Sequence, residues 1–123
     1  MLGAVVSRAT RRSIEQYAHD VLFSPLGASD VDWSRYADKI PAAASGLRLR
    51  SRDLTKIGQL ILDQGRCNGK PIVSEQWIED STTAEIGPAD RLFFYGFHWW
   101  LGRSLIDRRE ITWIAASGLG GTS

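Results

Sequence analysis

The sequence predicts an α+β fold, in which a mainly helical part over residues 1–91 is followed by a short antiparallel β-hairpin and a glycine-rich end over 92–123. Apolar residues recur at helical spacing in the first part, whereas the last part contains two apolar segments separated by a polar turn. A chain of 123 residues allows one domain at most. A two-stranded ribbon is marginal in water, so a hairpin as apolar as this one needs further strands to pair with. We therefore expect the chain to form a single incomplete domain.

Two helices are expected at the beginning of the chain. Apolar residues at helical spacing over 2–9 predict a short amphipathic helix. No N-cap precedes this helix, which indicates that its natural start lies upstream. Ser13, followed three residues later by Gln16, is a capping box for the second helix, and the Pro-Leu-Gly string at 25–27 ends that helix.

Residues 28–50 are mixed in character and predict a long surface connection, a kind of segment that often carries function. Ser51 is then expected to cap a third helix, with Asp53 favourably placed in the first turn and Gln64-Gly65 at the end. The buried face of this helix is expected to contain Leu54, Ile57 and Ile61.

Turn and strand signals dominate the remaining residues. The string Cys-Asn-Gly-Lys at 67–70 predicts a turn, Ser74 predicts the cap of a short helix, and residues 81–91 are interpreted as a loop. The aromatic run at 92–101 hardly alternates with polar residues, which predicts a strand buried on both faces. Residues 103–109 are interpreted as a polar turn, and 111–115 as a second strand paired with the first.

Composition and charge exclude several classes of function. Fifteen basic and fourteen acidic residues give a net charge of +1, and neither sign forms a block suited to nucleic acid or an anionic membrane. The apolar run at 92–101 is much shorter than the ~20 residues that span a bilayer. Cys67 is the only cysteine, so no intrachain disulfide and no cysteine-based metal site can form. We expect a soluble chain, with the cytoplasm favoured, that binds neither nucleic acid nor membrane and uses no metal or cofactor.

Few residues carry recognisable chemistry. The chain lacks a Gly-x-Ser-x-Gly elbow, a His-Glu-x-x-His helix, a Walker loop and paired Cys-x-x-Cys spacings. His19 is interpreted as a surface residue and His98 as a structural one. The acidic pairs Asp30 with Asp32 and Asp53 with Asp63 are interpreted as helix caps or solvated faces. No serine is followed three positions later by lysine, and no tyrosine is followed two positions later by asparagine.

Short strings follow one another in a characteristic order along the chain. They are Leu-Gly-Ala-Val-Val at 2–6, Phe-Ser-Pro-Leu-Gly at 23–27, Ala-Ser-Gly-Leu-Arg at 44–48 with Ser-Arg-Asp-Leu at 51–54, Gly-Arg-Cys-Asn-Gly-Lys at 65–70 with Ser-Glu-Gln-Trp at 74–77, and Tyr-Gly-Phe-His-Trp-Trp at 95–100. In this order they resemble the serine beta-lactamase and penicillin-binding-protein superfamily, in particular its class C, esterase and 6-aminohexanoate-dimer hydrolase branch. The resemblance covers nearly the whole chain and implies an incomplete piece of the beta-lactamase/transpeptidase-like fold.

In that family, the serine of a Ser-x-x-Lys string is acylated, the lysine and the tyrosine of a Tyr-x-Asn string manage protons, and a third element on a strand supplies the oxyanion donor. The first two elements are expected upstream of this chain. The resemblance places the third at Ala-Ser-Gly, with Ser117 and Gly118, and makes the backbone N–H of Leu119 the oxyanion donor. A register shifted by two residues, toward 120–121, and a frayed glycine-rich C-terminus are the alternatives.

By the same resemblance, Ser45 and Gly46 border the substrate pocket and Trp99 contributes to substrate binding. A structural turn is the alternative for the first two residues, and core packing is the alternative for Trp99. The intact bacterial hydrolase is expected to cleave a small amide or ester through an acyl-serine, whereas the chain by itself is expected to be inactive. The alternative hypothesis is a small non-catalytic helical interaction module, and unpaired strand edges predict self-association.

Overall fold

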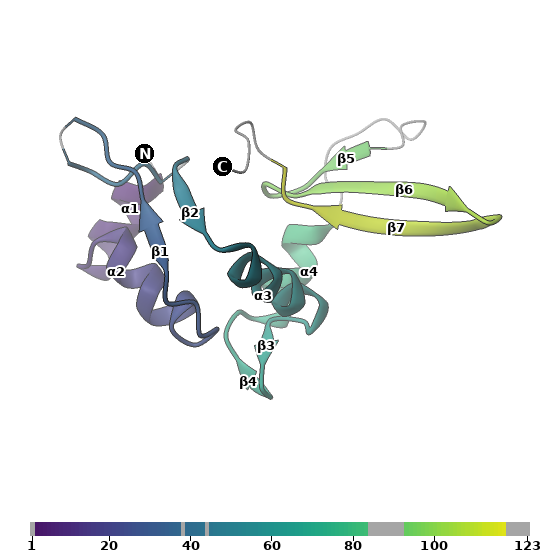
Figure 1. The fold of residues 1–123 in the computed structure, drawn as a ribbon, viewed down its shortest axis with the longest axis horizontal. Coiled ribbons are helices and arrows are strands. Elements are labelled where there is room, and N and C mark those ends of the chain that lie inside the picture. Colours follow the sequence, from purple (N-terminus) through teal and green to yellow (C-terminus); the bar gives the residue numbers. More distant parts are fainter. Residues whose placement is uncertain (1, 38, 44, 84–92, 118–123) are drawn as a thin grey trace. The chain divides into compact units, whose positions relative to one another are not determined.

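The computed structural model describes residues 2–37, 39–43, 45–83 and 93–117. Helices occur together with small antiparallel sheets, which confirms the predicted α+β fold class. The chain divides into two compact units, Met1–Val73 and Ser74–Ser123 (Figure 1). The expectation that all residues belong to a single incomplete domain stays a prediction.

The first unit begins with consecutive helical segments. They are α1 (Leu2–Thr10), α2 (Ile14–Ala18) and a π-helical turn, η1 (His19–Phe23). Ser13 caps α2 as predicted, because its Oγ accepts a hydrogen bond of 3.2 Å from the backbone N–H of Gln16. The helix ends before the Pro-Leu-Gly string, also as predicted, and Gly27 adopts the left-handed φ of 66° in the turn that follows.

Residues 28–50 contain more regular structure than the predicted surface connection. β1 (Val31–Trp33) and β2 (Leu47–Leu49) pair antiparallel, with Asp32 opposite Arg48. An isolated bridge joins Arg35 to Pro41 beyond the end of this ladder. The predicted connection therefore contains two short strands, because main-chain pairing between its two ends satisfies the backbone polar groups there.

α3 (Ser51–Leu62) is present as predicted, but it begins and faces differently. Arg50 occupies the N-cap position, so the predicted capping role of Ser51 is wrong, and no side chain caps the helix. Leu54 is 54% exposed, so its predicted place on the buried face is also wrong. The helix buries Asp53 and Leu60 and half-buries Ile57 and Ile61. Compared with the prediction, the buried face of α3 is therefore rotated about the helix axis so that it includes Asp53 and leaves out Leu54.

A tight hairpin follows α3. β3 (Arg66–Cys67) pairs with β4 (Lys70–Pro71), and the two residues between them are Asn68 and Gly69. Their φ angles are 49° and 77°, the left-handed pair that a type I′ turn requires and that Asn-Gly favours. The predicted turn at 67–70 is confirmed.

α4 (Glu75–Thr82) begins the second unit. Ser74 caps it as predicted, since its Oγ accepts a hydrogen bond of 3.2 Å from the backbone N–H of Trp77. Ile78 and Ser81 form the buried side of this helix. Because the helix runs to Thr82, the loop predicted for 81–91 begins later, and residues 84–91 lie outside the described part of the chain.

A three-stranded antiparallel sheet follows, in the order β5–β6–β7 (Figure 1). Its strands are β5 (Phe93–Tyr95), β6 (Trp100–Ile106) and β7 (Arg109–Ala115). The expectation of one strand over 92–101 is wrong, because the chain reverses after Tyr95 and pairs that residue with Trp100. Trp100 is 43% exposed, so burial on both faces is wrong as well. The reversal brings the two aromatic rings edge to face, with centroids 5.1 Å apart, a favourable arrangement.

The second strand and its hairpin pairing are confirmed, but the turn is shorter than predicted. β6 continues to Ile106, and the reversal takes place at Asp107 and Arg108, with φ angles of 49° and 63°. Arg103 stays within β6 because its guanidinium lies 3.6 Å from the Glu110 carboxylate and 5.5 Å from the centre of the Phe94 ring. Contacts with the neighbouring strands therefore keep Arg103 in β6, although the sequence predicted it to lie in the turn.

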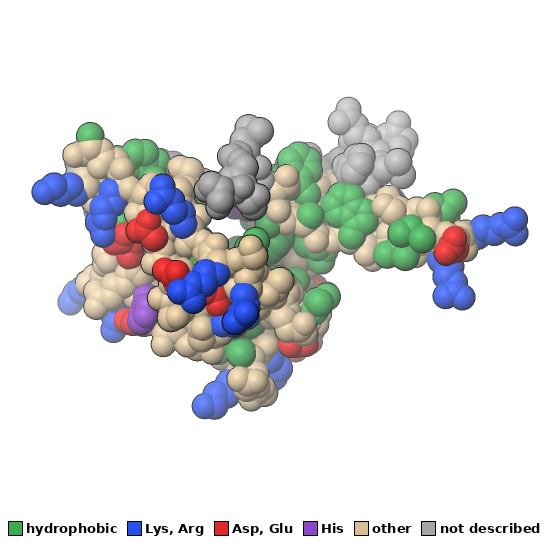
Figure 2. Space-filling view, viewed as in Figure 1, with side chains coloured by type: hydrophobic (Ala, Val, Ile, Leu, Met, Phe, Trp, Pro, Cys, Tyr) green, Lys and Arg blue, Asp and Glu red, His purple; other side chains and the backbone are tan. Residues whose placement is uncertain are grey.

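Each unit has a small apolar core. The buried apolar residues are Phe23, Leu26, Ala28, Ala42 and Leu60 in the first unit and Ile78 and Leu101 in the second. Hydrophobic side chains lie at the surface of the sheet in the space-filling view (Figure 2). Among the helices described, none has the length and apolar character needed to cross a membrane.

Candidate functional site

The Ala-Ser-Gly string, to which the resemblance assigns the oxyanion element, follows β7 in the sequence. This strand ends at Ala115, and Ser117 is an exposed residue two positions beyond it. Gly118 and Leu119 lie outside the described residues, as do the residues of the shifted register at 120–121. The assignment of Leu119 as oxyanion donor therefore stays a prediction.

Trp99 lies in the short link between β5 and β6 and is half-buried. Its carbonyl oxygen accepts a hydrogen bond of 2.9 Å from the N–H of Gly96, which closes the link. A Cβ placed on Gly96 would lie 2.8 Å from the Ser81 carbonyl oxygen, so a glycine is needed for this close approach to the end of α4. The Tyr-Gly-x-x-Trp-Trp string therefore has a local structural role, and the proposed part of Trp99 in substrate binding stays a prediction.

His98 takes part in the same link rather than in a catalytic arrangement. It adopts a φ of 66°, and its Nδ1 lies 3.4 Å from the hydroxyl oxygen of Tyr95. His19, in the first unit, is exposed and lies 3.1 Å from the Asp20 carboxylate. Both positions agree with the structural and surface interpretations drawn from the sequence.

Ser45 and Gly46 form the turn that leads into β2. The Ser45 N–H donates to the Ala42 carbonyl over 3.0 Å, and the Gly46 carbonyl accepts from the Ser34 N–H over 2.9 Å. Gly46 adopts a φ of 74°, and a Cβ placed on it would lie 2.5 Å from the Cβ of Ser34. This turn belongs to the first unit, whereas Trp99 and Ser117 belong to the second, so no single unit contains all the candidate residues.

The conformation of Gly46 predicts a stability effect. We expect Gly46→Ala to lower the free energy of unfolding by about 1–3 kcal/mol, because the new Cβ adds left-handed backbone strain to overlap with Ser34. Urea unfolding followed by circular dichroism measures the change. Ser45→Ala, which alters the adjacent exposed side chain, is the matched control and should stay within about 0.5 kcal/mol of the parent. Unchanged stability of Gly46→Ala would contradict the structural account of this glycine.

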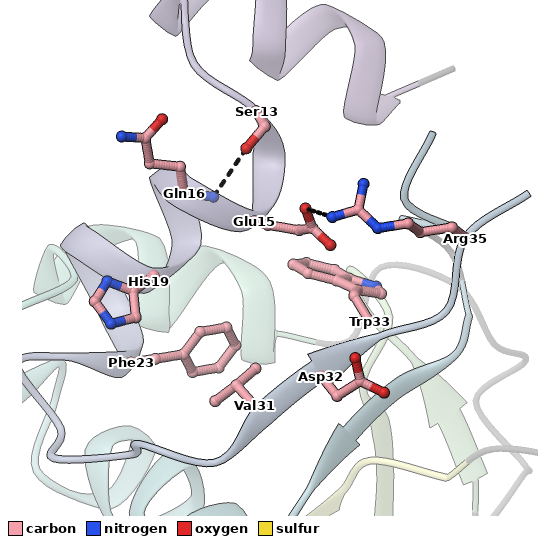
Figure 3. Close-up of a pocket in the computed structure, with 9 residues that line it drawn as sticks. All are labelled: Ser13, Glu15, Gln16, His19, Phe23, Val31, Asp32, Trp33 and Arg35. Carbon is pink, nitrogen blue, oxygen red and sulfur yellow. Dashed lines mark hydrogen bonds and ion pairs between the residues drawn. The ribbon is translucent and has the colours of Figure 1, made fainter. Parts of the chain in front are cut away.

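A pocket of about 390 Å³ lies between α2, η1 and β1 in the first unit (Figure 3). Its lining residues are Ser13, Glu15, Gln16, His19, Phe23, Val31, Asp32, Trp33 and Arg35. Figure 3 shows the Glu15 carboxylate and the Arg35 guanidinium joined beside the Trp33 ring, and the ion pair measures 2.5 Å. The Trp33 indole N–H donates to the Ala42 carbonyl over 3.0 Å, which fixes the ring against the loop.

The charged groups of this pocket already have partners. Asp32 lies 3.3 Å from Arg48, and the Ser13 hydroxyl accepts from the backbone N–H of Gln16. No nucleophile and base are therefore paired among the lining residues, and the pocket has the character of a structural junction. The sequence did not predict it, because Glu15 and Arg35 lie on segments that only tertiary packing brings together.

A second, more polar pocket of about 480 Å³ lies at the start of α3. It is lined by Gly27, Ser29, Arg50, Arg52, Asp53 and Lys56. Asp53 is 5% exposed, and its carboxylate accepts a hydrogen bond of 2.8 Å from the Lys56 ammonium. Asp63 accepts instead from the Gln59 amide at 3.0 Å. Asp63 is the exposed C-cap residue of α3, in agreement with the sequence interpretation, whereas Asp53 is buried beside Lys56, so its interpretation as a helix cap or part of a solvated face is wrong.

Acyl-serine chemistry requires a serine hydroxyl beside a group that takes its proton. Within the residues described, no serine hydroxyl is hydrogen-bonded to a lysine or tyrosine side chain; the Ser13 and Ser74 hydroxyls accept from backbone N–H groups, and that of Ser104 accepts from Trp113. The same residues contain no group of three histidine, cysteine or acidic side chains arranged to hold a metal ion. Comparisons with protein-family models and with curated proteins find no match to this chain.

Proposed function

We propose that this chain is part of a beta-lactamase-related serine hydrolase, whose intact form cleaves small amides or esters through an acyl-serine. The resemblance of the ordered sequence strings to the class C, esterase and 6-aminohexanoate-dimer hydrolase branch motivates the proposal. In this account the chain contributes the residues that border the substrate, and the nucleophile and its proton-transfer partners come from outside these 123 residues.

One observation carries the proposal. The Tyr-Gly-x-x-Trp-Trp string at 95–100 links β5 to β6, and the next strand, β7, pairs with β6 and ends directly before the Ala-Ser-Gly string. An oxyanion donor works when a rigid strand presents its backbone N–H toward the reacting carbonyl. The strand β7 leads into the Ala-Ser-Gly string, which supports the proposal that the third family element lies there.

Three further strings lie in helix starts or turns, which supports the proposal. The Asp-Leu string lies in the first turn of α3, the Asn-Gly string forms the turn between β3 and β4, and the Ser-Glu-Gln-Trp string begins α4. Each agreement is local, because each involves one helix cap or one turn. Together they support the proposal more strongly than any single string does.

The proposal predicts that the 123-residue chain is catalytically inactive. Acylation needs an activated nucleophile, and the chain contains neither a Ser-x-x-Lys nor a Tyr-x-Asn string. Incubation with nitrocefin and with a p-nitrophenyl ester should give no turnover above buffer, and intact-mass spectrometry should show no acyl adduct. A stoichiometric adduct on any serine of this chain would contradict the assignment.

The DNA upstream of the first codon provides the positive test. We expect an in-frame Ser-x-x-Lys string followed by a Tyr-x-Asn string, and the longer product should hydrolyse the ester. The matched control is the same product with that serine replaced by alanine, which should lose about 10³-fold or more in kcat because the nucleophile is gone. An upstream region without these strings would refute the hydrolase assignment and favour the interaction module.

A further inference from the structure

Among the residues that the structure describes, β7 is an edge strand without the usual protection against pairing. In the described part of the chain, it is paired with β6 on one side and with no strand on the other. Natural edge strands are commonly protected by proline, lysine, a bulge or short length. This strand is seven residues long, contains neither proline nor lysine, and carries its charged residues, Arg109 and Glu110, at the hairpin end. Charged side chains gather at the tip of this hairpin in Figure 2.

The hairpin geometry identifies which backbone groups point outward from β7. A two-residue turn closes on a hydrogen-bonded pair, which here is Ile106 with Arg109. Hydrogen-bonded and non-hydrogen-bonded pairs then alternate along the ladder. The backbone N–H and C=O groups of Glu110, Thr112 and Ile114 therefore point away from β6, toward the open edge.

These outward groups are self-complementary. When two copies of β7 run antiparallel with Thr112 opposite Thr112, Glu110 of each copy faces Ile114 of the other, and every outward N–H meets an outward C=O. Shifting the register by two residues leaves one outward residue of each copy without a partner. We therefore propose that two copies of this chain form a symmetric dimer through the outer edges of their β7 strands, in the register centred on Thr112.

The side chains support the same register. Residues 111 and 113 of opposite copies become cross-strand neighbours, which places an isoleucine beside a tryptophan, an aromatic and β-branched pair that stabilises sheets. Arg109 faces Ala115 across the dimer, so no like charges oppose each other. Ile111 and Ile114 are 45% and 44% exposed in one copy, and the dimer covers part of both side chains. A second copy is the partner because pairing between two identical strands satisfies both edges at once.

Sedimentation velocity of the full chain over a wide range of concentrations measures the association. Thr112→Pro removes one outward N–H from each copy without removing a hydrogen bond to β6, because proline is tolerated where its nitrogen faces away from the ladder. We expect this change to weaken the dimer at least about tenfold, since both central hydrogen bonds are lost and the ring obstructs the edge. Thr112→Val, which keeps the N–H and the branched shape, is the matched control and should dimerise like the parent.

A cysteine cross-link tests the register and does not depend on how the proline variant folds. The Thr112→Cys variant is made in a Cys67→Ser background, so that it contains a single cysteine. In the proposed dimer, the Cα atoms of residue 112 in the two copies lie about 5.5 Å apart, within the range for a disulfide. The Glu110→Cys residues of the two copies would lie about 14 Å apart and should not join. Mild oxidation should therefore give a covalent dimer with the first variant and monomer with the second.

The proposal does not depend on the hydrolase assignment, so the two can fail separately. A parent chain that stays monomeric at every concentration would overturn the dimer. Equal dimerisation of a folded Thr112→Pro variant would overturn the use of this edge. Equal cross-linking of the Glu110→Cys and Thr112→Cys variants would overturn the register.

Discussion

Replacing Asp53 by alanine is expected to lower the free energy of unfolding by about 2–4 kcal/mol, one of the largest effects of any single change in this chain. The Asp53 side chain is 6% exposed, and its carboxylate binds the Lys56 ammonium at 2.8 Å. The same ammonium donates to the Gly27 carbonyl at 2.7 Å, so the pair connects α3 to the turn that ends the helical segments. Removing the carboxylate leaves the ammonium with one acceptor in a place that solvent reaches only partly.

Urea unfolding followed by far-ultraviolet circular dichroism measures this loss. Asp63→Ala removes an exposed carboxylate at the other end of α3 and should change stability by no more than about 0.5 kcal/mol. The double variant Asp53→Ala with Lys56→Met should regain part of the stability, because no unpaired charge then remains. If Asp53→Ala unfolds at the parent's urea midpoint, this pair is not what holds the turn to the helix.

The elements that the sequence predicted correctly depend on interactions within a few residues. Ser13 and Ser74 each bind a backbone N–H three positions later, and Asn68-Gly69 adopts its turn through local backbone preference. Such signals act before any tertiary contact forms. This is why the starts of α2 and α4 and the hairpin after α3 appear where the sequence predicted them.

The errors occur where a distant partner decides the outcome. β1 and β2 are three residues each, too short to show alternation, and they are strands because they pair with each other across the loop. The exposure of Leu54 has a similar cause, because the contact of Lys56 with the Gly27 turn draws Asp53 to the buried side of α3. A hydrophobic pattern alone gives no information about such a contact.

The candidate site was predicted through family resemblance. Some of its residues have a structural role that the structure describes, whereas others lie outside the described residues. Gly46 and Gly96 have steric reasons to be glycine that hold without any substrate. Ser117 is exposed and lies two residues after the end of β7, whereas Leu119 lies beyond the described residues. The Glu15–Arg35 pocket was missed because neither residue carries a motif, and only packing of β1 against α2 and η1 creates it.

Replacing Gly102 by valine is expected to lower the free energy of unfolding by about 2–4 kcal/mol. A Cβ placed on this buried glycine of β6 would overlap the indole ring of Trp113 on the neighbouring strand. The ring would have to move, which breaks the 3.0 Å hydrogen bond from its Nε1 to the Ser104 hydroxyl. Valine favours strands by up to about 1 kcal/mol, so the steric and hydrogen-bond losses exceed the gain in propensity.

Two comparisons separate this steric effect from a general cost of replacing glycine. Gly58, within α3, has no atom within 4 Å of an added Cβ, so Gly58→Ala should raise stability by about 0.5–1 kcal/mol. Adding Trp113→Val to Gly102→Val removes the overlapping ring, so the two losses should sum to more than the loss of the double variant. Strictly additive losses would show that the indole does not rest on the glycine, because independent sites add whereas residues in contact do not.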